Sequence, residues 1–453
     1  MGVLFAPLLT RFYEPGTFGI YAVFTSLLSV IAVVSTLRFD LAIPVAKRDS
    51  EAATLCGLAI GSALLTALLV ACVGLISGKL SPRVPNHSFL YGVLLPLALC
   101  GTALTQVASY LGTREKAFSR LSLSRFVTGL FGPSTQAFVG PFHVGIFGLV
   151  AGLLCGLSAG VVVFFQTLKH WLVALVRNFS KESVFKVIAD YKSFPLFSTW
   201  GALLNVLSFH LPLLLVSRSF GAVVTGHLAL STRFIFLPLQ LVTSAVGQVF
   251  LGNASAALNE GRLGSAVLRL FARLNGAACI LVLPLGCLAP EGFQLIFGPD
   301  WAPAGRFASY LAPWLAMLVT GSPLSSVSVV THRQRGEFYF QIALFTSRTA
   351  ALVVGPRYLG VDATIALFAG ASAVLWLYYN VWILNVAGVN MRVVGKIVMT
   401  SLLTSLPAVF AAVYLKGLML DPGLTRVFAV TFFLALLAGL LLVYHQFVKR
   451  YAP

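Results

Sequence analysis

Two arginines lie in the middle of long apolar segments. Arg233, in HLALSTRFIFLPLQ, lies about ten residues into the apolar segment 223–250, and Arg348, in ALFTSRTAAL, lies about twelve residues into the segment 336–354. An arginine near the centre of a bilayer costs roughly 2.5–3.5 kcal/mol on insertion scales. Each guanidinium is therefore expected to be neutralised by a partner or to face a water-filled cavity rather than lipid.

The positions of the acidic residues favour the cavity. All 13 Asp and Glu residues lie in loops or at the ends of apolar segments, so none is placed to neutralise an arginine at mid-depth. A cationic cavity selects an anionic ligand, above all a phosphate, which the planar guanidinium grips with two parallel hydrogen bonds. For both arginines, and for Arg348 especially, a structural alternative stays open, in which the side chain snorkels or bonds helix carbonyls.

Further polar residues lie within or beside the apolar segments. Arg38, at the predicted inner end of the segment 18–36, either pairs with Asp40 or guards the cytoplasmic mouth of the cavity. Three amides and one histidine are candidates for a polar lining of the same cavity: Gln106, Asn205, Gln240 and His210. Amides also hold helices together, and a histidine near a helix end is more often structural than a proton switch, so both interpretations stay open.

Enzyme and nucleic-acid functions find no support in the residue pattern. The carboxylates form no catalytic group, and the six cysteines lie inside apolar segments without the CxxC spacing of metal or redox sites. We therefore expect no catalytic residue, no metal and no cofactor. The net charge of +18 comes from Lys and Arg spread singly through short loops, whereas a nucleic-acid footprint clusters them on one face. Nucleic acid is excluded as a partner.

The composition places these side chains in a membrane. The 453 residues are 58% hydrophobic and only 10% charged, with a mean hydropathy of +0.93, whereas soluble domains are about a quarter charged. Continuous apolar runs of about 20 residues cross a bilayer as helices and not as barrel strands. We predict an all-α, polytopic membrane protein with thirteen spans, at 18–36, 52–77, 88–110, 119–139, 143–165, 194–217, 223–250, 266–289, 305–330, 336–354, 362–386, 394–415 and 424–447.

Alternate loops differ in their basic content. The loops 38–51, 111–125 and 167–193 belong to a set that, together with the C-terminus, holds most of the Lys and Arg residues. By the positive-inside rule this richer set is cytoplasmic. The C-terminus is therefore predicted to lie inside the cell.

Two stretches about two hundred residues apart share a pattern. PLLTRFYEPGTFGIYAV, from Pro7, and PLLLVSRSFGAVVTGHLAL, from Pro212, both run from Pro-Leu-Leu through a short polar turn into the next helix. Six predicted helices separate the two copies, so both copies have the same orientation, as in parallel repeats. Comparison with the second copy predicts that the first helix is truncated.

The repeat predicts four parts. A six-helix N-terminal bundle, with an incomplete first helix, occupies residues 1–166, and a C-terminal helical bundle occupies 194–390. Between them, residues 167–193 are too charged to span and carry apolar residues at helical spacing, which predicts an amphipathic cytoplasmic linker; a plain loop is the alternative. Residues 391–453 supply two additional transmembrane helices.

Five longer motifs carry a family resemblance. They are PLLTRFYEPGTFGIYAVFTSLLSVIAVVSTLRFDLAIPVAKRDSEAA, KAFSRLSLSR, YKSFPLFSTWGALLNVLSFHLPLLLV, LALSTRFIFLPLQLVTSAVGQVF and LIFGPDWAPAGRFASYLAPW. Up to about residue 390 the chain resembles the Wzx-type polysaccharide flippases of the MOP superfamily, which also holds the MATE extruders and the lipid II flippases. The resemblance implies two six-helix lobes forming a V around a central cationic cavity, with alternating access. Arg38 and Arg233 fall in its motifs, whereas Arg348 rests on its depth in the span alone.

Residues and resemblance together predict a flippase. The expected cargo is an undecaprenyl-pyrophosphate-linked oligosaccharide, moved across the bacterial inner membrane for polysaccharide or lipopolysaccharide (O-antigen) synthesis, with the lipid bilayer and polysaccharide polymerase machinery as further partners. The arginines hold the pyrophosphate while the polyprenyl tail stays in lipid. Two alternatives remain: a MATE-type drug or ion antiporter, which the absence of a buried acid disfavours, and a membrane enzyme of polysaccharide assembly.

Overall fold

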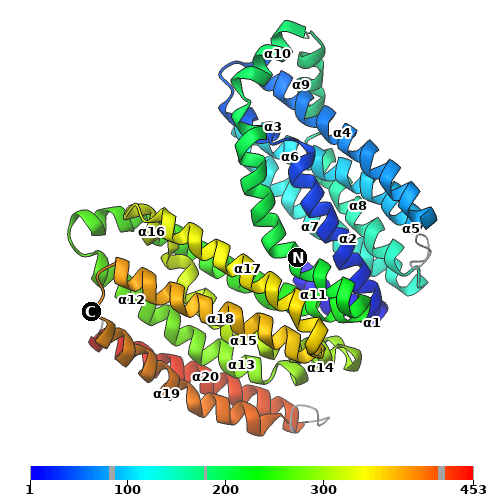
Figure 1. The fold of residues 1–453 in the computed structure, drawn as a ribbon. Helices are drawn as coiled ribbons and strands as arrows, with labels where there is room; N and C mark the ends of the chain where they lie inside the picture. The colour runs from blue at the N-terminus through cyan, green and yellow to red at the C-terminus, as the bar shows by residue number, and fades with distance from the viewer. Residues whose placement is uncertain (1, 81–86, 178–180, 417–423, 452–453) are drawn as a thin grey trace. The chain divides into compact units, whose positions relative to one another are not determined.

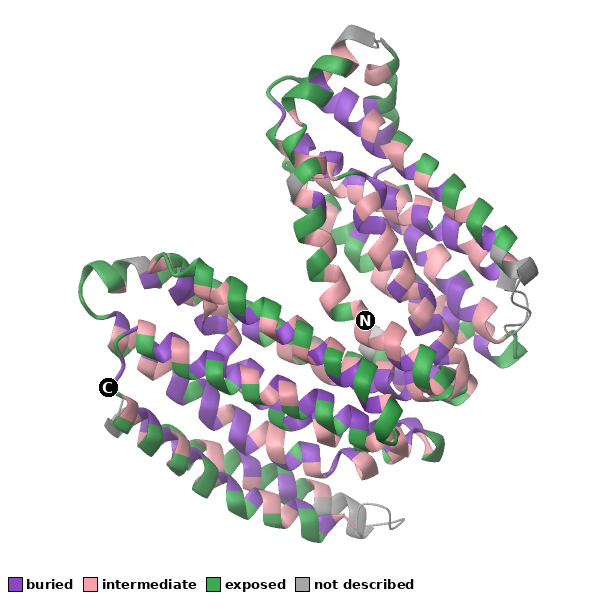
Figure 2. Cartoon of the chain, in the orientation of Figure 1, coloured by how far each residue is buried: buried purple, intermediate pink, exposed green. Residues whose placement is uncertain are grey.

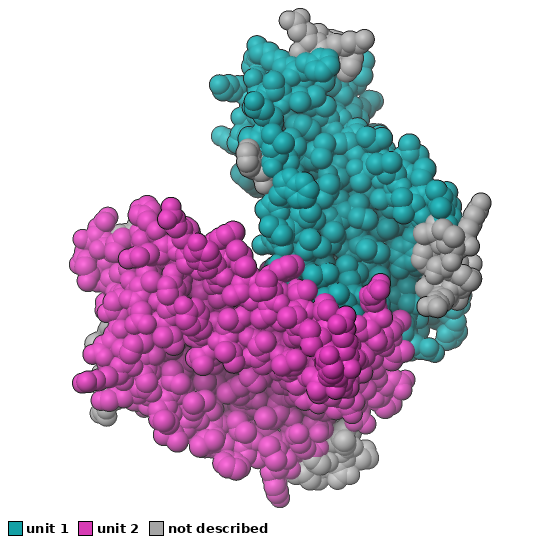
Figure 3. All heavy atoms as spheres, viewed as in Figure 1, with its two compact units in different colours: residues 1–217 teal, residues 218–453 magenta. Residues whose placement is uncertain are grey.

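The computed structural model describes residues 2–80, 87–177, 181–416 and 424–451, and within these ranges all regular elements are helices (Figure 1). The predicted all-α, polytopic membrane fold is confirmed. By their internal contacts, the residues form two compact units, Met1–Ser217 and Arg218–Pro453 (Figure 3).

Eleven stretches of the described helices are long and apolar enough to cross a membrane. The helix α7 (Phe118–Val139) lies where the span 119–139 was predicted but is not among them, because two arginines and several Ser and Thr residues lower its hydropathy. The predicted spans 194–217 and 223–250 fall largely in one 61-residue helix, α11 (Thr199–Asn259), whose backbone leaves the helical region at Gly221 (φ 83°, ψ −176°). Glycine adopts this conformation without steric cost, so Gly221 separates the two spans.

The first unit contains α7, the first part of α11 and a set of further helices and single turns. They are α1 (Gly2–Phe12), α2 (Pro15–Ser35), α3 (Phe39–Ala42), η1 (Ile43–Val45), α4 (Asp49–Leu80), α5 (His87–Phe89), η2 (Leu90–Leu94), α6 (Leu95–Arg114), η3 (Gly140–Phe142), α8 (Ile146–Val163), α9 (Phe165–Arg177), α10 (Lys181–Asp190) and η4 (Phe194–Ser198).

Small residues and a buried tyrosine fix the packing of the first unit. A Cβ at Gly156 of α8 would lie 2.9 Å from the Thr128 carbonyl oxygen of α7, so only glycine permits this close approach. Tyr13, between α1 and α2, is 3% exposed and donates a hydrogen bond to the Gln136 carbonyl oxygen of α7 at 2.8 Å. The polar corner near the N-terminus is therefore an anchor that holds α1 and α2 against α7.

The segment predicted as a linker packs within the first unit. Leu168 and Trp171 of α9 and Val187 of α10 are buried in a core shared with α3, α4 and α6. The Trp171 indole N–H donates to Glu115 at 2.8 Å. The compact division consequently falls at Ser217 and not at the linker, because these buried side chains tie α9 and α10 to α4 and α6. Residues 178–180, between the two helices, lie outside the described residues.

The second unit contains the rest of α11 and the following elements. They are α12 (Leu263–Ala277), η5 (Ala278–Val282), α13 (Leu283–Cys287), α14 (Ala289–Phe297), η6 (Pro299–Trp301), α15 (Ala302–Gly321), η7 (Ser322–Ser325), α16 (Ser326–Val330), α17 (Gln334–Tyr358), α18 (Val361–Val386), α19 (Met391–Leu415) and α20 (Leu424–Tyr451).

The last two helices are fastened to α12 by a buried polar chain. The Asn275 amide donates to the Ser401 hydroxyl at 2.9 Å, the Ser401 and Tyr444 hydroxyls bond each other at 2.9 Å, and Tyr444 donates to the Ala272 carbonyl at 3.0 Å. Hydrogen bonds between helices stabilise packing in a membrane, where apolar burial offers little gain. The two additional helices are thus part of the second unit.

The helices leave many large apolar side chains on the outside. Exposed residues run along outer helix faces while buried residues line the inner faces (Figure 2). On α4, Leu64, Leu65, Leu68 and Leu69 are each more than half exposed. Such extended apolar surface is unfavourable in water and matches a bilayer interior.

Candidate functional site

Arg233 lies on an exposed polar face of α11. Its side chain is exposed and makes no hydrogen bond or ion pair with any residue that the structure describes. Three further polar residues follow Arg233 on the same side of the helix: Gln240, Ser244 and Gln248. Their spacings of seven, four and four residues each return to the same helix face. All three are exposed. We call these four residues the polar face of α11.

Contacts with α15 and with the preceding turn η6 decide which way Arg233 points. Ser231 is fully buried, and its hydroxyl donates to the Ala304 carbonyl oxygen at 2.5 Å. His227, one turn earlier, has its Nε2 atom 3.0 Å from the Asp300 carbonyl oxygen. At 3.6 residues per turn, Arg233 lies on the opposite side of α11 from Ser231. The bonds at Ser231 and His227 therefore turn Arg233 away from the core of the second unit.

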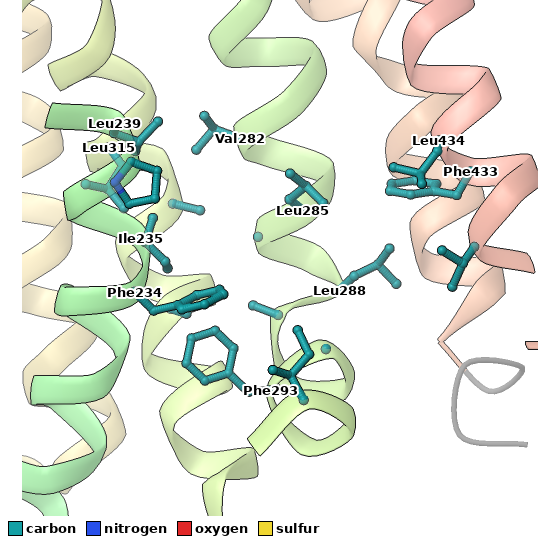
Figure 4. Close-up of a pocket in the computed structure, with 18 of the residues that line it drawn as sticks. Phe234, Ile235, Leu239, Val282, Leu285, Leu288, Phe293, Leu315, Phe433 and Leu434 are labelled. Atoms are coloured by element: carbon teal, nitrogen blue, oxygen red, sulfur yellow. The ribbon is translucent and has the colours of Figure 1, made fainter. Parts of the chain in front are cut away.

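The neighbouring face of α11 lines an apolar cavity. Phe234 and Ile235 line a cavity of about 380 Å³ together with side chains of α13, α14, α15 and α20, among them Leu285, Phe293 and Phe433 (Figure 4). Phe234 also packs edge-on against the rings of Phe293 and Phe297. The cavity lining is apolar throughout, so this cavity does not hold a phosphate.

Arg348 is buried inside the second unit. It is 8% exposed, and its Nε–H donates to the Ser372 hydroxyl of α18 at 2.9 Å. The guanidinium carbon lies 4.5 Å from the ring centroid of Trp314 on α15 and 5.7 Å from that of Phe368 on α18. These distances are within the range of cation–π contacts.

The location of Arg348 corrects the expectation that it opens into a hydrated cavity. Its Nη2 atom is buried and has no hydrogen-bond partner among the described residues, and the residue is only 8% exposed, so little of the side chain reaches solvent. Two aromatic rings and one hydroxyl take the place of an acidic partner. Arg348 therefore joins α15, α17 and α18 through a hydroxyl and two rings, and not by snorkelling or by a bond to a helix carbonyl.

Arg38 lies in a strained turn at the end of α2. Leu37 and Arg38 both adopt the left-handed conformation, with φ of 47° and 59°, which costs a non-glycine residue free energy. Arg38 is half-buried, and its Nε atom is buried without a hydrogen-bond partner in the part of the chain that the structure describes. It forms no ion pair with Asp40; the ion pairs of the described residues are Arg48–Glu51, Arg114–Asp49, Arg262–Glu260 and Arg306–Asp362.

Asp40 was identified from the sequence only as a possible partner of Arg38, and its burial was not predicted. Although it lies at a span end, it is 0% exposed. One carboxyl oxygen accepts a hydrogen bond from the Thr36 hydroxyl at 2.8 Å, and the other has no partner among the described residues. Burial raises the pKa of the Asp40 carboxyl above its ordinary value, although the Thr36 bond, the Arg38 charge and nearby backbone N–H groups act in the opposite direction. The hydropathy of the sequence does not indicate that an acid at the end of a span is buried.

The remaining candidates lie in different surroundings. Asn205 and Gln240 are exposed on α11, Gln106 is half-buried on α6, and none of the three forms a hydrogen bond with a described residue. The His210 ring lies 3.2 Å from the fully buried Ser26 hydroxyl of α2. His210 therefore has the structural hydrogen bond that is usual for a histidine near a helix end. Within the described ranges, no three His, Cys, Asp or Glu residues form a group that could hold a metal ion.

Residues 8–306 match the family model of the polysaccharide biosynthesis proteins. The chain belongs to this family. The family is one of Wzx-like flippases. The matched stretch includes Arg38 and Arg233 and ends before Arg348. No curated protein matches the sequence.

Two solved structures share the fold of this family member. A lipid II flippase, MurJ, in an inward closed conformation superposes with a TM-score of 0.75 over 99% of this chain and 96% of that chain, at 14% identity. An inward-facing multidrug resistance transporter of the MATE family superposes with a TM-score of 0.61 over 86% of this chain and 95% of that chain, also at 14% identity. The family match and the apolar helices together show a multi-pass membrane protein of a polysaccharide biosynthesis family.

Proposed function

We propose that this protein translocates an undecaprenyl-pyrophosphate-linked oligosaccharide across the bacterial inner membrane, for the synthesis of a surface polysaccharide. The proposal is supported by the family match and carried by one observation, the exposed and unpaired guanidinium of Arg233 deep within a membrane span. A lipid-facing arginine at this depth costs roughly 2.5–3.5 kcal/mol, so Arg233 is stable only where water or an anion reaches it.

The chemistry of Arg233 fits a pyrophosphate. A guanidinium offers parallel N–H donors that match two phosphate oxygens, and it keeps its charge at all physiological pH values. Gln240, Ser244 and Gln248 continue the polar face with neutral donors and acceptors, which suit the hydroxyls of a sugar chain. Arg233 would bind the charged head group while Gln240, Ser244 and Gln248 contact the sugars and the polyprenyl tail stays in lipid.

Arg38 is the second residue proposed to contact the pyrophosphate. It is half-buried in the unstable turn at the end of α2, it lies within the family match, and it makes no ion pair with the residues described. Arg348 does not belong to the proposed binding set, because two rings and Ser372 enclose its guanidinium. Alternating access would expose the bound head group first to the cytoplasm and then to the periplasm.

The test is a charge reversal at Arg233. We expect Arg233→Glu to abolish surface polysaccharide in a complemented deletion strain, because a carboxylate repels pyrophosphate. Arg357→Glu is the matched control, since Arg357 is an exposed arginine of the same unit, in the last turn of α17, and should leave polysaccharide at the wild-type level. Protein in the membrane fraction is quantified for both variants.

Two results would contradict the proposal. Normal polysaccharide in a strain that carries folded Arg233→Glu would remove the anion-binding role of Arg233. Wild-type protein that raises resistance to cationic drugs but does not restore polysaccharide to the deletion strain would assign the chain to drug export instead.

A further inference from the structure

Asp40 and Arg38, which lie two residues apart, each have a buried polar atom that lacks a hydrogen-bond partner among the described residues. The unpartnered carboxyl oxygen of Asp40 and the unpartnered Nε–H of Arg38 are both buried, two residues apart, yet no ion pair joins them. Burial of the charged carboxylate costs more free energy than burial of the neutral, protonated carboxyl, because the charge loses its hydration. The observed geometry therefore fits a neutral, protonated Asp40.

The elements packed against α3 offer no other free cation to Asp40. On α6, the Arg114 guanidinium donates to the Ile43 and Ala46 carbonyls at 3.1 and 2.7 Å and to Asp49 at 2.8 Å, so its donors are occupied. On α4, Asp49 and Glu51 are acidic and accept from Arg114 and Arg48. Neither η1 nor η4 carries a charged residue.

Tyr110 of α6 is the remaining titratable group near the pair, and it interacts electrostatically with both Asp40 and Arg38. Its phenol is neutral at physiological pH, so it does not replace a cation. Among the described residues that face Asp40, Arg38 is thus the one that can compensate an ionised carboxylate.

The backbone around Arg38 is suited to a local change. Two consecutive non-glycine residues with positive φ are held in a conformation that L-amino acids rarely adopt, and relaxation of Leu37 or Arg38 would redirect the Arg38 side chain. The turn lies between α2 and α3, next to the carboxyl.

We propose that Asp40 is a proton-binding site that controls Arg38: a protonated Asp40 leaves Arg38 free to bind the pyrophosphate head group, and an ionised Asp40 pairs with Arg38 and removes it. The reaction at Asp40 is the uptake or release of one proton by the carboxyl group. The second half of the proposal rests on the proposed function, whereas the proton site does not. The consequence is that head-group affinity rises as the pH falls, which couples the proton to the cargo.

The first experiment measures the proton directly. Infrared difference spectra of the purified full-length protein in lipid vesicles, titrated from about pH 5 to about pH 8, should contain a titrating band of a protonated carboxyl that is lost in Asp40→Asn. Asp190→Asn is the control, because Asp190 is an exposed acid of the same unit on α10. A band that persists in Asp40→Asn overturns the proton site.

A second variant keeps the test independent of how well Asp40→Asn folds. In Arg38→Gln the positive charge near Asp40 is gone, so the Asp40 band should persist to higher pH than in the wild type. An unchanged titration in Arg38→Gln means that Arg38 does not compensate Asp40, and the proposed pair is then wrong.

The second experiment measures the coupling with farnesyl pyrophosphate as the probe. We expect its affinity for the wild type to rise about tenfold from pH ~8 to pH ~5.5 beyond the change that the probe's own titration causes, since one charge-assisted contact is gained. Asp40→Asn should bind as the wild type does at low pH, without the extra pH dependence. Arg38→Gln should bind weakly at every pH.

The possible failures separate the two proposals. If Asp40→Asn retains the full pH dependence of binding while Arg233→Glu abolishes polysaccharide, the control of Arg38 by Asp40 is wrong and the flippase function stands. If the Asp40 band titrates as expected but Arg233→Glu leaves polysaccharide intact, the proton site stands and the proposed function fails.

Discussion

Arg233 and Arg348 occupy equivalent places in the sequence and opposite places in the structure. Each lies near the middle of an apolar helix of the second unit, on α11 and α17. Arg233 is exposed on a polar face and pairs with no described residue, while Arg348 is 8% exposed and contacts Trp314, Phe368 and Ser372. Depth in a span therefore signals that an arginine has a role, but it does not distinguish ligand binding from helix packing.

The largest difference between the two arginines should appear on charge reversal. In Arg348→Glu a carboxylate meets the electron-rich faces of two rings without a cation, so we expect a loss of about 3–5 kcal/mol in stability and little folded protein. Arg233→Glu should change stability by less than about 1 kcal/mol, because the side chain is exposed. Thermal unfolding in detergent, followed by size-exclusion chromatography, measures both. Equal stability of the two variants would contradict the conclusion that Arg348 supports helix packing while Arg233 does not.

The next largest effect concerns ligand affinity. Arg233→Gln removes the charge but keeps a polar side chain, and we expect farnesyl pyrophosphate to bind roughly 10- to 100-fold more weakly, which corresponds to about 1.5–3 kcal/mol for a charged hydrogen bond. Isothermal titration calorimetry on the detergent-solubilised protein provides the measurement. Affinity that stays within twofold of the wild type would place the pyrophosphate elsewhere.

A smaller effect is expected where Arg348 is replaced by an apolar side chain. Arg348→Met loses one hydrogen bond and the cation–π contacts but also removes a buried charge with an unpartnered donor, so stability should change by no more than about 1–2 kcal/mol. Polysaccharide export and pyrophosphate affinity should both remain. If Arg348→Met folds normally and export stops, Arg348 has a direct role in transport after all.

Ser231 sharpens the comparison because it fixes the rotation of α11. Ser231→Ala removes the hydroxyl that bonds the Ala304 carbonyl at 2.5 Å, and we expect a loss of about 1 kcal/mol in stability with export retained. Thr346→Ala, at an exposed threonine of α17 whose hydroxyl bonds only its own helix, serves as the control and should change less. A greater loss in the control would show that the contact with α15 does not orient Arg233.

The smallest expected effect is a change in how stability depends on pH. It extends the comparison to Asp40, the buried acid of the first unit. Because burial raises the pKa of Asp40 in the folded protein, its contribution to stability is complete below the ordinary pKa of an aspartate and is lost as the pH rises through the folded-state pKa. As the pH rises from the ordinary pKa of an aspartate, about 4, to the folded-state pKa, stability of the wild type should therefore fall relative to Asp40→Asn. Parallel melting temperatures of the two proteins across this range would contradict a raised pKa.

Much of the fold was predictable because lipid imposes a simple rule. A chain in hydrocarbon must satisfy its own backbone hydrogen bonds, so long apolar runs become helices. The runs at 52–77 and 394–415 match α4 (Asp49–Leu80) and α19 (Met391–Leu415) closely. The helix α7 shows where the rule weakens, since its arginines and hydroxyls reduce its hydropathy although the helix forms at the predicted place.

The candidate site was predictable only in part. The sequence identified Arg233 and Arg38 and associated both with an anionic ligand, which remains our proposal. It grouped Arg348 with them, because mid-span position is readable along a chain, whereas the cover that Trp314 and Phe368 provide comes from other helices. It identified Asp40 only as a possible partner of Arg38 and did not reveal its burial, because a residue at the end of a span is exposed or buried according to what packs around it.

The sequence by itself determined that this chain is a bundle of membrane helices, where most of the helices lie, and that certain charges sit at costly depths. These properties follow from hydropathy and length, which are sums over neighbouring residues. Only the tertiary structure decided which arginine is exposed, which is buried, and which carboxyl has one oxygen without a hydrogen-bond partner. Such outcomes depend on the rotation of each helix about its axis, and contacts between residues far apart in the chain, such as that of Ser231 with Ala304, set this rotation.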